Sequence, residues 1–134
     1  MSLNRHQIRE AAFQTLFALD SNPEASHDEL YHQVLAHYHD ESETPAYLVT
    51  IVDGVLEHRE AINEQISQYL KKTWSLKRIS RTDRLILEIA FFEIDYVDEV
   101  PGKVAVNEAI ELAKNYADET SKNFINGVLS NQLS

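Results

Sequence analysis

Residues of the types that could hold a metal ion gather early in the chain. Two Glu-x-x-His pairs occur there, Glu24 with His27 and Glu29 with His32, and helical bundles build di-metal sites from this pattern. Such a site needs the two copies on different, facing helices. Here both copies stand at the start of one expected helix, so a polar, solvated helix face is the better explanation and no metal site is predicted.

Basic side chains near the start of the chain are candidates for binding nucleic acid. Arg5 and Arg9 stand four positions apart, which places them on one face of a helix, and His6 is adjacent. Arginine binds RNA phosphates and also stacks on bases. Two arginines on a helix are also commonly just solvated, and the pattern alone leaves both interpretations open.

A second candidate site lies near the end of the chain, at Ser121, Lys122 and Asn123. Hydroxyl and amide groups at a helix start, together with unbonded backbone N–H groups, suit a phosphate. The simpler interpretation is that Thr120 or Ser121 only caps the last helix.

Charge is segregated along the chain, although the net charge is −10. Between residues 20 and 64 Arg59 is the one basic residue apart from histidines, whereas residues 71–84 hold six Lys or Arg and only one acid, Asp83. Such segregation can give one face a field opposite in sign to the total. A solvated face without a partner explains the charge equally well.

Composition excludes several classes of function. The 134 residues include no cysteine, which removes disulfide scaffolds, cysteine-ligated zinc, iron–sulfur clusters and thiol chemistry. The three glycines stand too far apart for a phosphate-binding loop, and nothing groups a nucleophile with a base and an orienting acid. We therefore expect no cofactor and no catalysis. Neither a signal peptide nor a membrane span is apparent, so a cytoplasmic location is expected.

The elements that must position these residues are helical, because three Gly and three Pro are too few for a sheet protein. Apolar spacing predicts about seven helices, over residues 4–20, 26–38, 45–56, 62–70, 80–94, 104–113 and 120–129. Residues 71–79, which include Trp74, are interpreted as a connection. The pattern weakens at residues 57–60, where we place a boundary between subdomains of about 1–58 and 59–134. The predicted fold class is all-α, a single domain of two small helical bundles packed across each other.

Several segments together resemble the NusB transcription antitermination factors. The middle of the chain matches at residues 74–79, 83–87 and 90–93, and the more specific segments are VAVNEAIELAK at 104–114 and FINGVL at 124–129. Residues 5–17 resemble the arginine-rich first helix of that family. The resemblance implies an all-helical fold of two perpendicular three-helix bundles and a role without catalysis.

The resemblance also implies partners. NusB proteins pair with NusE, a small-subunit ribosomal protein, and the pair binds the boxA element of nascent ribosomal RNA leaders. Together with NusA and NusG, the pair helps RNA polymerase to read through terminators. A homodimer remains open as well, and it could hide the RNA-binding surface.

Residue roles carry over by position. The resemblance implies RNA contacts at Arg5, His6 and Arg9, and a second set at the start of the last helix, namely Thr120, Ser121, Lys122 and Asn123. It implies a NusE-facing surface that includes Phe17 and Asp83, an aromatic anchor and a charge for a basic partner. The simpler alternatives are core packing for Phe17 and helix capping for Asp83.

This chain departs from the family in having few basic residues in its first basic cluster. Gln7 and Ile8 interrupt the bases, and His6 is mostly uncharged at neutral pH. So few phosphate contacts predict weak binding to RNA by the chain alone, with a basic partner essential. The alternative function is a helical protein-binding adaptor that has lost RNA recognition.

Overall fold

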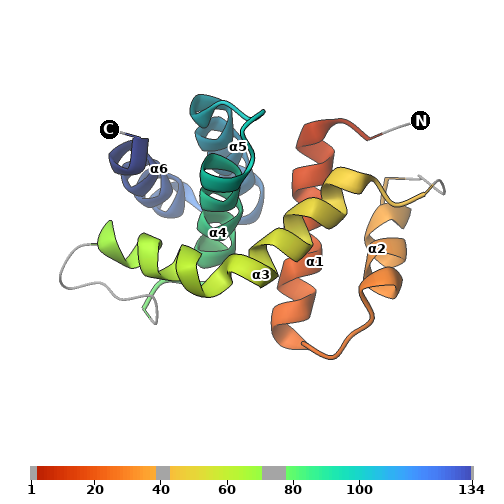
Figure 1. Ribbon diagram of the computed structural model, residues 1–134. Helices are drawn as coiled ribbons and strands as arrows, with labels where there is room; N and C mark the ends of the chain where they lie inside the picture. Colours follow the sequence, from red (N-terminus) through yellow and green to blue (C-terminus); the bar gives the residue numbers. More distant parts are fainter. Residues whose placement is uncertain (1–2, 39–42, 71–77, 134) are drawn as a thin grey trace. The chain divides into compact units, whose positions relative to one another are not determined.

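The computed structural model describes residues 3–38, 43–70 and 78–133 (Figure 1). All regular structure in these residues is helical, which confirms the predicted all-α fold class. The six helices are α1 (Arg5–Ser21), α2 (His27–Ala36), α3 (Ala46–Gln68), α4 (Arg81–Tyr96), α5 (Gly102–Tyr116) and α6 (Glu119–Leu133). None of these described helices is long and apolar enough to span a membrane. Most of the predicted connection at 71–79, including Trp74, lies outside the described residues.

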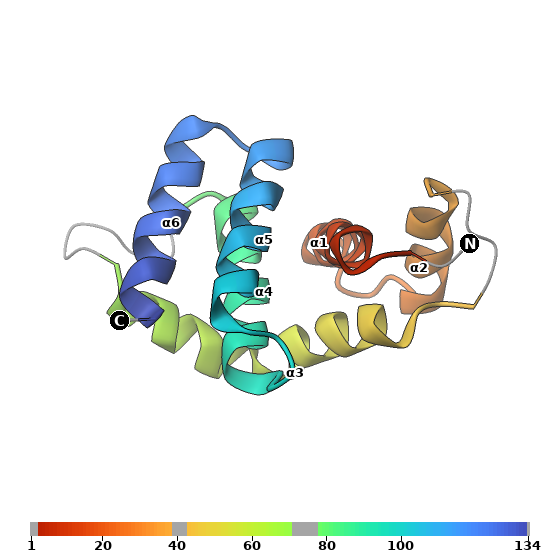
Figure 2. The same ribbon diagram turned by 90° about the horizontal axis from the view of Figure 1, so that it is seen from above.

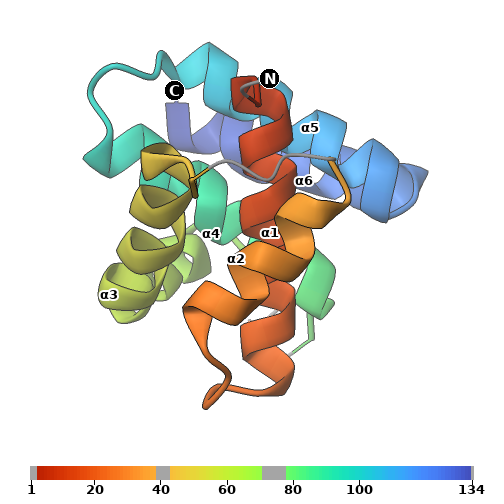
Figure 3. The same ribbon diagram turned by 90° about the vertical axis from the view of Figure 1, so that its right-hand side faces the viewer.

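The chain divides into two compact units, Met1–Gly54 and Val55–Ser134. In the first unit α1 and α2 pack side by side, as Figure 3 shows. Helix α1 buries a stripe of apolar side chains at helical spacing, with Phe13, Leu16 and Leu19 at most 5% exposed. The first turns of α3 complete this unit.

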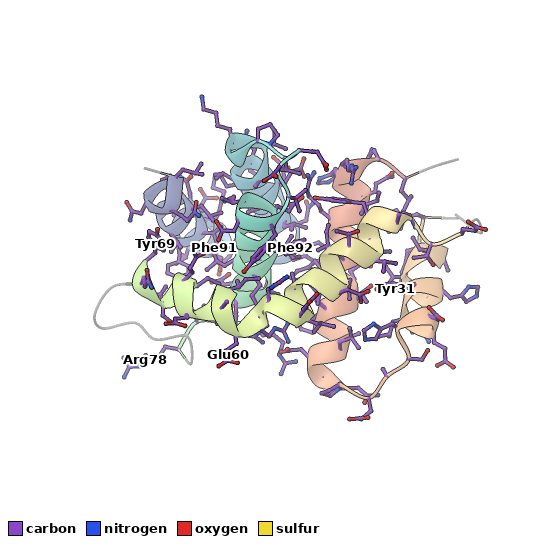
Figure 4. All side chains as sticks on the ribbon, in the orientation of Figure 1. Tyr31, Glu60, Tyr69, Arg78, Phe91 and Phe92 are labelled. Carbon is purple, nitrogen blue, oxygen red and sulfur yellow. The ribbon has the colours of Figure 1, made fainter. Side chains whose placement is uncertain are left out.

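The second unit is built on a bundle of α4, α5 and α6, which all contact one another. Figure 2 shows α5 and α6 lying side by side and running in opposite directions. Their ends meet closely, since a Cβ atom added at Gly102 would lie 2.8 Å from Cδ2 of Leu133. The rings of Tyr69, just after α3, and Phe91 of α4, both labelled in Figure 4, lie 5.9 Å apart between centroids.

Helix α3 differs from the prediction, because the expected third and fourth helices are one continuous helix. The stretch from residue 57 to residue 60 is polar, but it contains no glycine or proline that would break the backbone ladder. The buried apolar positions continue on both sides of it, at Val55 and Ile62. The polar stretch therefore lies within a helix, with Glu57 and Glu60 exposed and His58 and Arg59 partly buried.

Side-chain caps fix where several helices begin. Asn4 forms a capping box with Gln7 at the start of α1, and Ser26 and Ser80 cap α2 and α4. At α6 the cap is Asp118, whose Oδ1 accepts a hydrogen bond of 2.8 Å from the backbone N–H of Ser121. The prediction of a cap at Thr120 or Ser121 was therefore wrong, because a carboxylate stands just before them.

Candidate nucleic-acid interface

Arg5 lies on the first turn of α1 and its side chain is stacked on an aromatic ring. The guanidinium carbon Cζ is 3.7 Å from the centroid of Tyr47, a residue of the first turn of α3 in the same unit. Arg5 remains exposed, and the first turn of α1 contains no acidic residue. The start of this helix therefore presents an oriented positive charge to solvent.

His6 lies beside a carboxylate. Its Nε2 is 3.9 Å from Oε2 of Glu10, one turn further along α1, and the hydroxyl of Tyr38 donates to the other oxygen of Glu10 across 3.3 Å. The carboxylate of Glu10 would thus partly neutralise the charge of a protonated His6. His6 is consequently a weaker phosphate ligand than Arg5.

Arg9 does not join Arg5 on the surface. It is 3% exposed and falls on the buried side of α1 with Ile8 and Ala12. The spacing of four placed Arg5 and Arg9 on one face, but burial starts between them, one turn into the helix. The RNA contact at Arg9 stays a prediction, and it would require the side chain to leave this buried position.

The second predicted set surrounds the start of α6. Thr120 and Asn123 are exposed, and Lys122 is partly exposed. The Nζ atom of Lys122 lies 3.0 Å from Oε1 of Glu119, whose side chain is 76% exposed. An ion pair this open to water is weak, so Lys122 can exchange Glu119 for a phosphate at little cost.

Ser121 is already engaged within the chain. Its hydroxyl donates to Oδ2 of Asp83 across 3.1 Å, which joins the first turn of α6 to the first turn of α4. The structure therefore brings together one residue predicted for RNA and one predicted for the protein partner.

Asp83 is 8% exposed, and its Oδ1 is buried without a hydrogen-bond partner among the described residues. Burial raises the pKa of the Asp83 carboxyl above its ordinary value, and the charge of Asp118 adds to this while the bond from Ser121 opposes it. The residue does not cap α4 with its side chain, since Ser80 does so. A buried carboxylate that lacks full compensation destabilises the free chain.

Phe17 is partly packed against the chain and partly exposed. Its ring centroid is 6.1 Å from that of Phe13 at a tilt of 46°, so one side of the ring packs within the chain. The residue is nevertheless 38% exposed. The exposed part is available to a partner.

Sequence reasoning missed a buried ion cluster in the second unit. Glu88 is fully buried on α4, and its carboxylate accepts from Arg59 at 3.1 Å and from Arg84 at 3.2 Å. The spacing of Arg84 and Glu88 is a helical ion-pair signal, but nothing in the sequence linked Arg59 to them. One member of the basic stretch 71–84 is therefore committed to an internal pair.

The Glu-x-x-His residues do not converge on a metal site. His27 points its Nδ1 toward Oδ1 of Asp53 at 3.8 Å, with both side chains substantially exposed. Within residues 3–38, 43–70 and 78–133, no three side chains of the metal-ligating types come together.

The fold therefore places the chain in the class of small all-helical proteins, with exposed basic and polar side chains at two helix starts. The sequence profile of the NusB family matches residues 6–134. A transcription antitermination protein NusB from Levilactobacillus brevis is 57% identical over 134 residues, covering 99% of this chain and 94% of that protein. The chain therefore belongs to the NusB family, as the resemblance predicted.

Solved structures agree with this assignment. NusB from T. maritima is 32% identical, with a TM-score of 0.84 over 98% of this chain and 91% of that one. A crystal structure of the antitermination factors NusB and NusE in complex with double-stranded RNA contains a chain that is 27% identical. That chain matches with a TM-score of 0.81 over 95% of this chain and 93% of its own length.

Proposed function

We propose that this protein is a transcription antitermination factor that binds boxA-type RNA of ribosomal RNA operon leaders as a heterodimer with the ribosomal protein NusE. Its family membership is the observation that carries the proposal, together with a structural neighbour solved with NusE and double-stranded RNA. The outward-facing guanidinium of Arg5 supplies a suitable contact for RNA on this chain.

The proposed RNA contacts fall in two places. In the first unit they are Arg5, with His6 in a lesser role because Glu10 lies beside it. In the second unit they are Thr120, Lys122 and Asn123 at the start of α6, with Ser121 taking part when it gives up its bond to Asp83. Small exposed polar groups and one exchangeable lysine suit phosphates and bases of a single strand.

The proposed NusE contacts are Phe17 and Asp83. An exposed aromatic ring at Phe17 is the type of anchor that dominates protein interfaces. The net charge of −10 favours a basic partner, and such a partner would also supply the positive charge that RNA needs. Asp83 is 8% exposed, so we propose that a donor from NusE reaches its carboxylate only at that exposed edge.

The wider assembly would contain NusA, NusG and RNA polymerase in the cytoplasm, where bacterial RNA is made. In it this chain acts by binding alone, without catalysis and without a cofactor. The two helix starts of the described chain offer few cations to RNA. In this proposal NusE therefore supplies the remaining positive charge of the RNA-binding surface.

The alternative is a helical protein-binding adaptor that has lost RNA recognition. Two observations favour it: Arg9 is buried, and Lys122 is paired with Glu119. Both reduce the positive charge that the chain offers to a phosphate.

Fluorescence anisotropy with a labelled boxA-type RNA separates the two functions. The RNA is titrated with the chain alone, with NusE alone and with both proteins, next to a scrambled RNA of equal length. Tighter and sequence-selective binding by the pair is expected. Equal binding of both RNAs by a heterodimer shown to form by gel filtration would instead favour the adaptor. Gel filtration of the free chain also tests for a homodimer.

A further inference from the structure

The stack of Arg5 on Tyr47 is more than a local packing contact. A guanidinium carbon 3.7 Å from a ring centroid is well within the range of a cation–π interaction. The two residues come from the starts of two different helices, α1 and α3, so the ring fixes the side chain from outside its own helix.

The stack leaves the hydrogen-bonding edge of Arg5 unoccupied. Arginine has five N–H donors in a planar fork, and stacking uses the flat face without using any of them. Arg5 makes no hydrogen bond or ion pair within residues 3–38, 43–70 and 78–133, and it is exposed. By contrast, Arg59 and Arg84 both donate to the buried Glu88.

We infer that Tyr47 is a positioning residue for RNA binding: its ring holds the guanidinium of Arg5 so that the donor edge meets an RNA backbone phosphate. Planar donors match two phosphate oxygens only in a limited set of orientations. A long arginine side chain loses rotamer freedom when it is fixed, and the stack imposes that loss before RNA arrives. This inference rests on the proposed function. It adds Tyr47, an uncharged residue, to the residues proposed for RNA binding.

The salt dependence of RNA affinity distinguishes loss of the Arg5 charge from loss of its orientation. Loss of a phosphate contact reduces the slope of log affinity against log salt by about 0.7 for a single strand. Arg5→Ala is expected to weaken binding of boxA-type RNA by the complex with NusE and to reduce that slope. Tyr47→Leu keeps the cation, so the expected result is an affinity about two- to fivefold lower, the size of an exposed cation–π contact, with little change of slope. Tyr47→Phe keeps the ring and should retain the affinity.

A double-mutant cycle completes the test. In the Arg5→Ala background, Tyr47→Leu should have no further effect on RNA affinity, because the group that it positions is gone. An equal loss from Tyr47→Leu in both backgrounds, or full affinity of Tyr47→Leu, overturns the inference. Thermal melting of each variant checks that the fold is intact, and binding to NusE alone should not change. Failure of the unaltered complex to bind RNA would instead remove the proposed function and this inference with it.

Discussion

The hydroxyl of Ser121 donates a hydrogen bond to Oδ2 of Asp83 across 3.1 Å, between residues 38 positions apart. The bond ties the start of α6, where we propose RNA contacts, to a residue that we propose for NusE. While Asp83 is ionised, Ser121 must direct its proton inward, and the hydroxyl cannot donate to a phosphate at the same time. A donor from NusE to the exposed edge of the Asp83 carboxylate would weaken this competition.

Stability should depend on pH through Asp83. Burial raises the pKa of its carboxyl in the folded chain, so the folded state binds this proton more tightly than the unfolded state. The contribution of Asp83 to the free energy of unfolding therefore falls as pH rises from its ordinary pKa, about 3.9, through the raised value. Asp83→Asn should gain in stability relative to the unaltered chain across that window. Urea unfolding at a series of pH values measures the difference.

The control for this experiment is Asp98→Asn, which removes an exposed carboxylate. A difference between Asp83→Asn and the unaltered chain that does not change with pH would contradict the assignment.

Stability should be sensitive to substitution of Glu88, a buried charged residue of the second unit. Glu88→Ala leaves Arg59 and Arg84 without the buried carboxylate that both of them contact. Breaking a fully buried pair costs about 3–5 kcal/mol, and this is the upper limit here because the side chains of Arg59 and Arg84 are 26% and 20% exposed to water. Denaturant unfolding measures this loss. Glu111→Ala, which breaks an exposed pair with Lys114, is the control and should cost about 1 kcal/mol or less. Similar losses for the two variants would argue against the buried cluster.

Two tyrosines of the first unit should respond in opposite directions to loss of the hydroxyl. Tyr31 is 3% exposed and its hydroxyl has no hydrogen-bond partner in the described chain, so Tyr31→Phe should preserve or raise stability. Tyr38 donates to Glu10, so Tyr38→Phe should lose about 0.5–1.5 kcal/mol. Burial also raises the pKa of Tyr31 to about 12, which an ultraviolet titration can detect. A clear loss of stability in Tyr31→Phe would show that its hydroxyl is bonded after all.

Lys122 offers a direct test of the second RNA site. Lys122→Ala should weaken binding of boxA-type RNA by the complex with NusE and reduce the salt slope by about 0.7. Lys114→Ala is a matched control, since Lys114 also pairs with a glutamate three positions earlier but lies on α5. Equal effects of the two substitutions would mean that Lys122 acts only through the overall charge.

The sequence predicted the helices better than it predicted which side chains contact one another. Apolar spacing located α1, α2, α4, α5 and α6, because each helix buries a regular stripe that its own residues reveal. The predicted break at residues 57–60 was wrong, since a change of hydropathy along a helix does not interrupt its backbone hydrogen bonds. The burial of Arg9 was not foreseen for a related reason: helical spacing gives the face of a residue and not what covers that face.

Long-range pairs could not be predicted at all. Tyr47 under Arg5, Asp83 with Ser121, and Arg59 with Glu88 each join residues on different helices, and no local periodicity encodes them. The family resemblance supplied the residues Phe17 and Asp83, but it could not supply the burial of the Asp83 carboxylate. That burial follows from packing of α4 against α6.

Helix α3 belongs to both compact units, since it runs from Ala46 to Gln68 while the units divide between Gly54 and Val55. No flexible linker stands at that division. A helix gains stability by extension from an existing turn, so either half of α3, once formed, nucleates the other. We therefore expect the two units to unfold in one cooperative transition, and a chain cut after Gly54 to yield two fragments that each carry a frayed, poorly stable helix end.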